Sequence, residues 1–161
     1  MVSKAPARRN ASKAKQSDPV IDTLNARLAD LVDLHGQIKQ AHWNVTGMDF
    51  IAIHLLFDEQ ATMARDMADT VAERARALQG AADGTIRLAV ERSTIDEFPH
   101  GLIDSKKAIA ELVDRYEQLS ESFSNASDEA ADAEDKATED VYVELIRTID
   151  KQAYFLRAHL K

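Results

Sequence analysis

Apolar residues recur at every third or fourth position along four long segments of the chain, the spacing that one buried face of an α-helix requires. The segments cover residues 20–38, 51–78, 102–123 and 141–160. Asp18 and Pro19 precede the first segment as an N-cap acid and an N1 proline, and Asp49 is placed to cap the second. No segment alternates apolar and polar residues with period two, so we predict no strand. The pattern indicates an all-α fold, a four-helix bundle in which each helix buries one apolar stripe.

Residues 80–101 form a long connection between the second and third predicted helices. A connection of this length lets those two helices run parallel. Within it, Thr94-x-x-Glu97 has the form of a capping box, which predicts a short extra helix that ends at Pro99. Glu97 and His100 also match the Glu-x-x-His spacing of di-iron bundles. Because Pro99 breaks the helix that this motif needs and no second copy occurs, we interpret the match as coincidence.

The first 17 residues differ in composition from the rest of the chain. They contain no acid and no aromatic residue, but five bases: Lys4, Arg8, Arg9, Lys13 and Lys15. We predict a disordered basic arm over residues 1–17 and one bundle domain over residues 18–161. The net charge of the whole chain is −8, whereas residues 18–161 hold 15 bases against 28 acids and carry −13. The arm is therefore the part expected to bind DNA, through non-specific phosphate contacts, and a solvated tail is the alternative.

The absence of cysteine from the 161 residues narrows the chemistry. Without a thiol there is no disulfide, zinc finger or thiolate-bound cluster, so any metal must be bound by His, Asp or Glu. No run of 18 apolar residues occurs, and the N-terminus lacks the apolar region of a secretory signal. We therefore expect a cytoplasmic protein with no membrane partner.

The second predicted helix carries four metal-binding side chains within one quadrant: His54, Asp58, Asp69 and Glu73. These residue types suit a hard or borderline metal such as iron. Asp58 and Asp69 are nonetheless 11 residues apart, about 16 Å along a helix, which is too far for one site. Positions 54 and 73 share their midpoint with positions 58 and 69, between residues 63 and 64. Two such helices packed antiparallel about that midpoint would build two identical intersubunit sites about 22 Å apart, which His42 at the end of the first helix could also reach.

A less specific interpretation of this helix face stays open from the spacing alone. Asp66, Asp69 and Glu73 are interleaved with arginines, and a solvent-exposed face of this kind forms i,i+4 ion pairs. His35 lies two turns before His42 on a similar face of the first helix. We interpret His35 as a packed or hydrogen-bonded histidine rather than a ligand.

Two motifs give the metal interpretation a precedent. Residues His42 to Asp58 read H-W-N-V-x-G-x-x-F-x-x-x-H-x-x-F-D, and Asp69 to Arg74 read D-x-x-x-E-R. On these residues the chain resembles the Dps family, the ferritin-like "DNA-binding protein from starved cells", also called miniferritins. The helix pattern is similar over residues 20–161. Gln79 stands where the family often has the first glycine of Leu-Gly-Gly, and the N-terminal arm lies outside the resemblance.

The resemblance implies a ferritin-like four-helix bundle that assembles into a hollow homo-dodecamer. It implies ferroxidase centres at two-fold interfaces, with ligands from both subunits: His42, His54 and Asp58 from one, and Asp69 and Glu73 from its partner. The implied reaction oxidises Fe(II), preferentially with hydrogen peroxide, and stores iron as ferric oxide, which protects DNA. A nucleoid-structuring DNA-binding protein with secondary iron chemistry is the chief alternative, and a purely structural helical assembly is another.

Residues 126–140 hold seven acids and a single base, Lys136. Acids at a helix start interact favourably with the helix dipole, which explains the cluster without any function. In a hollow shell, some of these acids would line a negative pore that admits Fe(II). We predict that role for Asp135, Glu139 and Asp140.

Overall fold

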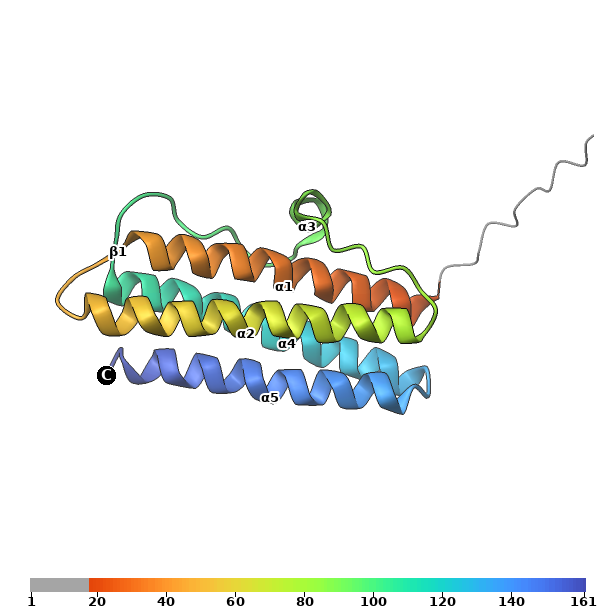
Figure 1. Cartoon of the computed structure of the whole chain (residues 1–161). Coiled ribbons are helices and arrows are strands. Elements are labelled where there is room, and N and C mark those ends of the chain that lie inside the picture. The colour runs from red at the N-terminus through yellow and green to blue at the C-terminus, as the bar shows by residue number, and fades with distance from the viewer. Residues whose placement is uncertain (1–17) are drawn as a thin grey trace, which may run out of the picture.

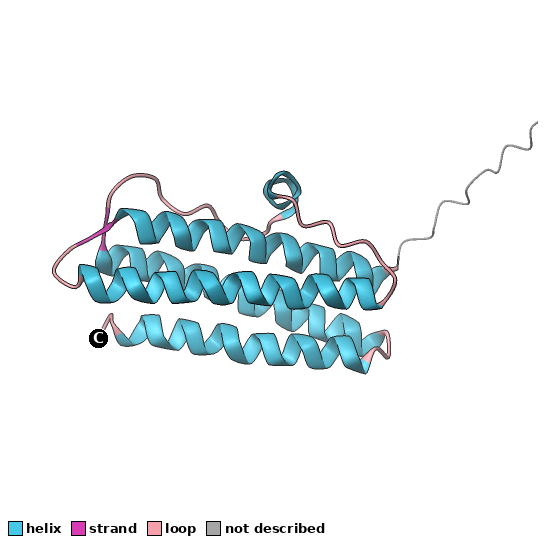
Figure 2. Ribbon diagram, in the orientation of Figure 1, coloured by secondary structure: helices cyan, strands magenta, loops and turns pink. Residues whose placement is uncertain are grey.

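The computed structural model describes residues 18–161, which form four long helices and a short one. The long helices are α1 (Pro19–Asn44), α2 (Phe50–Ala77), α4 (Ser105–Asp132) and α5 (Lys136–Ala158). They pack along their length, with α2 and α4 running in one direction and α1 and α5 in the other (Figure 1 and Figure 2). The predicted all-α four-helix bundle is therefore confirmed, including the parallel course of the two helices that the long connection joins.

The core lies between the apolar stripes of the four long helices. Phe57, Phe123 and Tyr142 are among its largest buried side chains, and the last two meet edge to face with ring centroids 5.7 Å apart. The stripe of α4 runs further than its large residues suggest, because Ala126 and Ala130 extend it toward the helix end. Some residues of the predicted stripes are instead exposed on the single chain: Ile51, Leu55, Leu102 and Leu160.

The helix starts follow the predicted signals in part. Asp18 caps α1, since its carboxylate accepts a hydrogen bond from the Val20 amide at 3.1 Å, and Pro19 is the first helical residue. Asp49 stands at the N-cap position of α2, but its side chain makes no capping hydrogen bond. The positions of both N-caps were thus predicted correctly, but only Asp18 makes the capping hydrogen bond.

Two short strands occur where none was predicted. β1 (Val45–Thr46) follows α1 and pairs in parallel with β2 (Ile103–Asp104), which precedes α4. The Thr46 hydroxyl also donates to the Ile103 carbonyl at 3.1 Å. This bridge fixes the turn between α1 and α2 against the start of α4.

The long connection contains its helix in a different place from the one predicted. α3 (Ile86–Arg92) begins after Thr85, whose hydroxyl accepts a hydrogen bond from the Leu88 amide. Residues 94–99 are not helical, so the prediction of a helix there is wrong.

A buried carboxylate explains why Thr94 starts no helix. The Thr94 amide and hydroxyl both donate to Asp30 of α1, at 2.7 and 3.2 Å, so the amide that a capping box would pair with Glu97 is already engaged. Burial raises the pKa of Asp30, although the Thr94 amide and the Arg27 guanidinium, 2.9 Å away, favour its charged form. The connection is therefore held against α1 by a tertiary contact.

Both α2 and α4 end in a Schellman motif whose left-handed position holds a residue other than glycine. After α2 this residue is Gln79, with φ +63°, and after α4 it is Glu134, with φ +59°. Gly80, next to Gln79, is required for a separate reason. A Cβ atom at that position would lie 2.6 Å from the Ile21 side chain.

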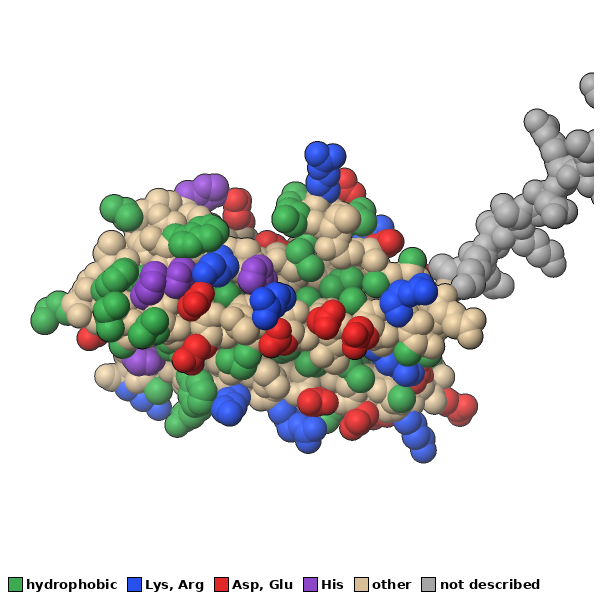
Figure 3. Space-filling view, viewed as in Figure 1, with side chains coloured by type: hydrophobic (Ala, Val, Ile, Leu, Met, Phe, Trp, Pro, Cys, Tyr) green, Lys and Arg blue, Asp and Glu red, His purple; other side chains and the backbone are tan. Residues whose placement is uncertain are grey.

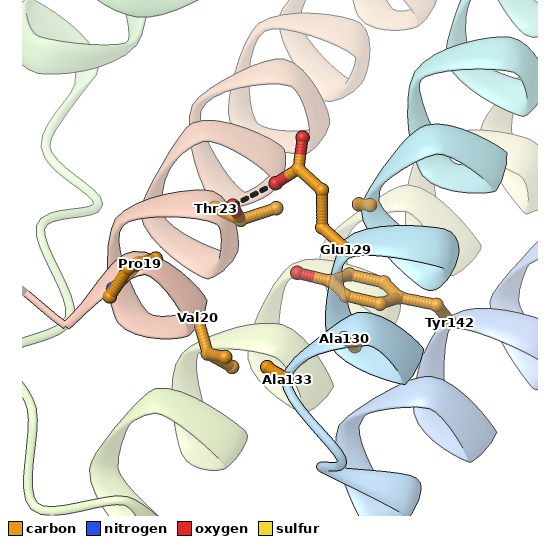
Figure 4. A pocket seen from close by; sticks show the side chains of 8 residues that line it. Pro19, Val20, Thr23, Glu129, Ala130, Ala133 and Tyr142 are labelled. Atoms are coloured by element: carbon orange, nitrogen blue, oxygen red, sulfur yellow. Dashed lines mark hydrogen bonds between the residues drawn. The ribbon is translucent and has the colours of Figure 1, made fainter.

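A small cavity lies between the start of α1, the end of α4 and Tyr142 of α5 (Figure 4). It has about 30 Å³ of free space, and the buried Tyr142 hydroxyl beside it has no hydrogen-bond partner among the described residues. The Thr23 hydroxyl donates to Glu129 at 2.6 Å at the same place. This volume suits water and is too small for an organic substrate.

Within residues 18–161, no helix has both the length and the apolar composition needed to cross a membrane. The predicted basic arm, with Lys4, Arg8, Arg9, Lys13 and Lys15, lies outside the described residues.

Candidate metal centre

Two histidines from neighbouring helices meet at one end of the bundle. His42 lies in the last turn of α1 and His54 in the second turn of α2, and their rings stack with centroids 3.7 Å apart and planes 21° apart. The Nδ1 atom of each ring lies 2.8 Å from the backbone carbonyl oxygen of the other residue. A carbonyl oxygen only accepts hydrogen bonds, so each Nδ1 carries a hydrogen and each neutral ring keeps a lone pair on Nε2. This arrangement is typical of histidines that bind metals through Nε2.

Asp58 follows His54 by one turn of α2 and lies beside the histidine pair. Its Oδ1 atom is 4.0 Å from Nε2 of His42 and accepts a hydrogen bond from Nζ of Lys39 at 2.7 Å. The hydrogen bond and the positive charge of Lys39 lower the pKa of the Asp58 carboxyl. Lys39 also lies over the ring of Trp43, 5.6 Å from its centroid. In the single chain, the ammonium of Lys39 therefore occupies a position at Asp58 for which a metal cation would have to compete.

Lys39 was not predicted as part of the site. A signal was present, because Lys39 lies three residues before His42 and so on the same face of α1.

Asp69 and Glu73 lie further along α2 and are exposed. Within residues 18–161 of one chain, no three His, Asp or Glu side chains lie close enough together to bind a single metal ion. The fold places His42 against His54 and Asp58 beside this pair, but the three do not form a complete metal site, and the other two predicted ligands lie apart from them. Figure 3 shows histidine, basic (Lys or Arg) and carboxylate side chains gathered along the face where α1 and α2 lie side by side.

The three acids predicted for the pore lie at the start of α5. Asp135 is the N-cap of this helix, and its carboxylate accepts hydrogen bonds from the amide and hydroxyl of Thr138, at 3.1 and 2.7 Å. Arg74 of α2 also donates to both of its oxygens, at 2.9 and 3.1 Å. Glu139 and Asp140 follow in the first turns of α5, and Asp140 is exposed. The Asp135 carboxylate is therefore engaged in capping and in an ion pair.

Comparison with known proteins agrees with this fold. Residues 21–161 match the ferritin-like domain family. The chain is 34% identical over 150 residues to a DNA protection during starvation protein of Agrobacterium fabrum, which covers 93% of this chain and 91% of the relative. Among solved structures, it is similar to DpsA14 from Streptomyces coelicolor, with 39% identity and a TM-score of 0.84 over 89% of this chain and 84% of that one. A Dps protein from Bacillus brevis is 29% identical and gives a TM-score of 0.84 over 89% and 95% of the two chains.

The bundle and the domain match define a ferritin-like protein. Within that class, the chain belongs to the Dps family.

Proposed function

We propose that this protein is a miniferritin that oxidises Fe(II), preferentially with hydrogen peroxide, and stores the ferric product inside a hollow homo-dodecamer. Membership in the Dps family supports iron storage and DNA protection in general. The observation that carries the finer proposal is the pair of stacked histidines, His42 and His54, with free Nε2 atoms beside the ionised Asp58.

A second copy of the chain would complete the ligand set. Two imidazoles and one carboxylate from a single chain leave an iron site incomplete, and the other two predicted ligands, Asp69 and Glu73, are about 16 and 22 Å further along the helix than Asp58. When two copies of α2 pack antiparallel about the point between residues 63 and 64, Glu73 of the partner subunit comes level with His54, and Asp69 of the partner subunit comes level with Asp58. The dimer then has two identical ferroxidase centres, each shared between subunits.

Fe(II) is the substrate of such a centre, and its ligands suit both oxidation states. Imidazole and carboxylate donors bind Fe(II), and the hard carboxylates favour Fe(III) further. Each hydrogen peroxide molecule accepts two electrons, one from each of two Fe(II) ions, takes up two protons and is reduced to two water molecules. No hydroxyl radical is released, and hydrolysis of the ferric ions to oxide releases protons from water to the solvent. This pairing of reactions would protect DNA.

Iron would enter the shell near the start of α5, where Glu139 and Asp140 add negative charge. Asp135 would hold this helix end in place through Arg74 and Thr138 as well as adding charge to the pore.

The test is a double variant, His42→Ala with Asp58→Ala, compared with His100→Ala. His100 is exposed and paired with Glu97 at 2.7 Å, so its loss removes one imidazole without touching the centre. Anaerobic Fe(II) is mixed with hydrogen peroxide, ferric product is followed by absorbance, and light scattering reports the assembly. We expect the double variant to assemble and to lose peroxide-driven oxidation, while His100→Ala behaves as the wild type. Wild-type oxidation kinetics in an assembled double variant would contradict the site.

DNA binding by the arm is the second candidate function, and the +5 charge of residues 1–17 favours it. Twelve arms on one shell would add avidity to weak phosphate contacts. In that case we propose a cytoplasmic protein that associates with the nucleoid.

A further inference from the structure

A third histidine of the same face shares the arrangement of the two centre histidines. His35 of α1 is half-buried, and its Nδ1 atom lies 2.9 Å from the carbonyl oxygen of Ala61 in α2. As at His42 and His54, a carbonyl acceptor forces the hydrogen onto Nδ1, so the neutral ring keeps its lone pair on Nε2. Nε2 of His35 holds no hydrogen bond within the described residues. The structure therefore orients His35 as it orients the two proposed ligands, which packing alone does not require.

His35 cannot serve the ferroxidase centre of its own chain. It precedes His42 by seven residues, which is about 10 Å along α1, and the two residues lie within about 20° of the same helix face. The ammonium of Lys39, between them on this face, points to Asp58 rather than to His35. A cation bound at His35 would thus occupy a separate site.

The position of His35 relates it to the two-fold axis of the proposed dimer, and this inference rests on that dimer. Helix carbonyls point toward the C-terminus, so the Ala61 oxygen lies within about 2 Å of the level of the midpoint between residues 63 and 64. The ring bound to it therefore lies near the level of the axis along α2, and in the proposed dimer we place it on the face that the partner covers. The two-fold operation brings the partner subunit's His35 to the same level from the other side.

We propose that the two His35 side chains of a dimer form a second metal site, on the two-fold axis, for one borderline divalent cation such as Fe(II), Zn(II) or Co(II). Two neutral rings that present lone pairs to each other repel unless a cation lies between them. Imidazole nitrogen is the donor that these ions accept readily, and water completes the coordination. The site holds one ion per two subunits, midway between the two ferroxidase centres.

The experiment measures Zn(II) binding to the assembled protein by isothermal titration calorimetry in the His42→Ala, Asp58→Ala background. This background removes the ferroxidase centre, so its oxidation assay reports on the proposed function and its residual binding reports on His35. We expect one residual Zn(II) per two subunits, lost when His35→Asn is added. Asparagine keeps an N–H that can reach the Ala61 carbonyl and removes the second ring nitrogen. His100→Asn in the same background is the matched control and should keep the residual ion.

Three results would overturn the proposal while leaving the ferroxidase assignment intact. They are an absence of residual Zn(II) in the background, an unchanged residual stoichiometry after His35→Asn, and equal losses from His35→Asn and His100→Asn. If His35→Asn prevents assembly, His35→Gln takes its place, because its side-chain amide can also donate to the Ala61 carbonyl. The residual Zn(II) per two subunits is then measured in that variant and tests the proposal in the same way.

Discussion

The imidazole rings of His42 and His54 stack 3.7 Å apart, and each donates its Nδ1 hydrogen to the backbone carbonyl of the other residue at 2.8 Å. The pair joins the end of α1 to the start of α2 by two reciprocal hydrogen bonds. In the proposed centre both rings would therefore be oriented before a metal arrives, and little side-chain freedom would be lost on binding. The carboxylate beside them, Asp58, is half-exposed and is held by Lys39 instead.

If the centre is shared between subunits as proposed, two inactive variants should complement each other. Asp58→Ala and Asp69→Ala should each lose peroxide-driven Fe(II) oxidation as homo-oligomers. In a mixed dimer, one centre carries both substitutions and the other carries neither. Random mixing by coexpression should therefore restore about one quarter of the wild-type centres. The measurement is the initial rate of ferric formation per subunit at saturating Fe(II).

The control for this experiment is the pair Asp58→Ala and His54→Ala, which affect the same half of the centre. Coexpression of these two should restore nothing, because every centre contains one of the substitutions. If Asp58→Ala and Asp69→Ala also restore nothing in mixed shells of confirmed composition, the intersubunit assignment is wrong.

Lys39 predicts an unusual gain of affinity on removal of a charge. Its ammonium donates to Asp58 at 2.7 Å and competes with any cation for that oxygen. Lys39→Met should tighten Zn(II) binding at the centre on the order of a few-fold, a modest effect because both side chains keep contact with water. Calorimetry gives the dissociation constant, and Lys106→Met, an exposed lysine at the start of α4, is the control. Weaker binding by Lys39→Met would show that the lysine supports the centre rather than competing for it.

Asp135 predicts a defined pH dependence of stability. Burial alone would raise its pKa, but Thr138 and Arg74 outweigh burial and hold the pKa below its ordinary value of 3.8. A carboxyl with a depressed folded pKa stabilises the fold above its unfolded pKa, and that contribution is lost as the pH falls through the folded pKa. Asp135→Asn keeps a good N-cap and removes the charge, so it should cost about 1 kcal/mol at neutral pH, whereas Asp135→Ala should cost about 2 kcal/mol.

Urea unfolding at a series of pH values measures both effects. The gap between the wild type and Asp135→Asn should be constant at neutral pH, should begin to narrow as the pH falls through the ordinary carboxyl pKa of 3.8, and should close only below the lower folded pKa, where the wild-type carboxyl is protonated as well. A gap that persists undiminished at pH 2 would mean that the loss is one of packing rather than of charge.

Most of the fold could be predicted from local sequence, and so could the part of the candidate centre that lies on α2. The apolar spacing set the four long helices, and the quadrant that holds His54 and Asp58 was readable from helical geometry alone. The helix predicted to start at Thr94 does not form, because the Thr94 amide donates to Asp30, a residue 64 positions earlier in the chain. Local sequence does not reveal such a tertiary contact. The sequence prediction missed the last turns of α4 and the first turn of α5. Alanines continue the buried face of α4 there, and the buried Thr138 continues that of α5, where no large apolar residue does.

The left-handed residues that end α2 and α4 predict stabilisation by glycine. Gln79 and Glu134 both have a positive φ, which strains any residue with a Cβ atom. Gln79→Gly and Glu134→Gly should each raise the free energy of unfolding by about 0.5–1 kcal/mol, after the larger chain entropy of glycine is subtracted. Gly80→Ala is the opposite control, and it should destabilise because its Cβ would meet Ile21 at 2.6 Å. Equal or lower stability of both glycine variants in urea would contradict the strain argument.

The charge division between arm and body predicts where DNA binds. Residues 1–17 carry +5 and residues 18–161 carry −13, so we expect attraction to phosphate to come from the arm and to oppose the net repulsion by the body. Deletion of residues 2–17 should abolish retardation of plasmid DNA in low-salt gels and leave Fe(II) oxidation unchanged. A second variant that keeps the arm's length but replaces its five bases with glutamine should behave like the deletion, because the contacts are electrostatic. Wild-type binding should also fall steeply as salt is raised. Retardation that survives the deletion would place the DNA contacts on the acidic body, and retardation that survives only the glutamine variant would make the arm's role steric rather than ionic.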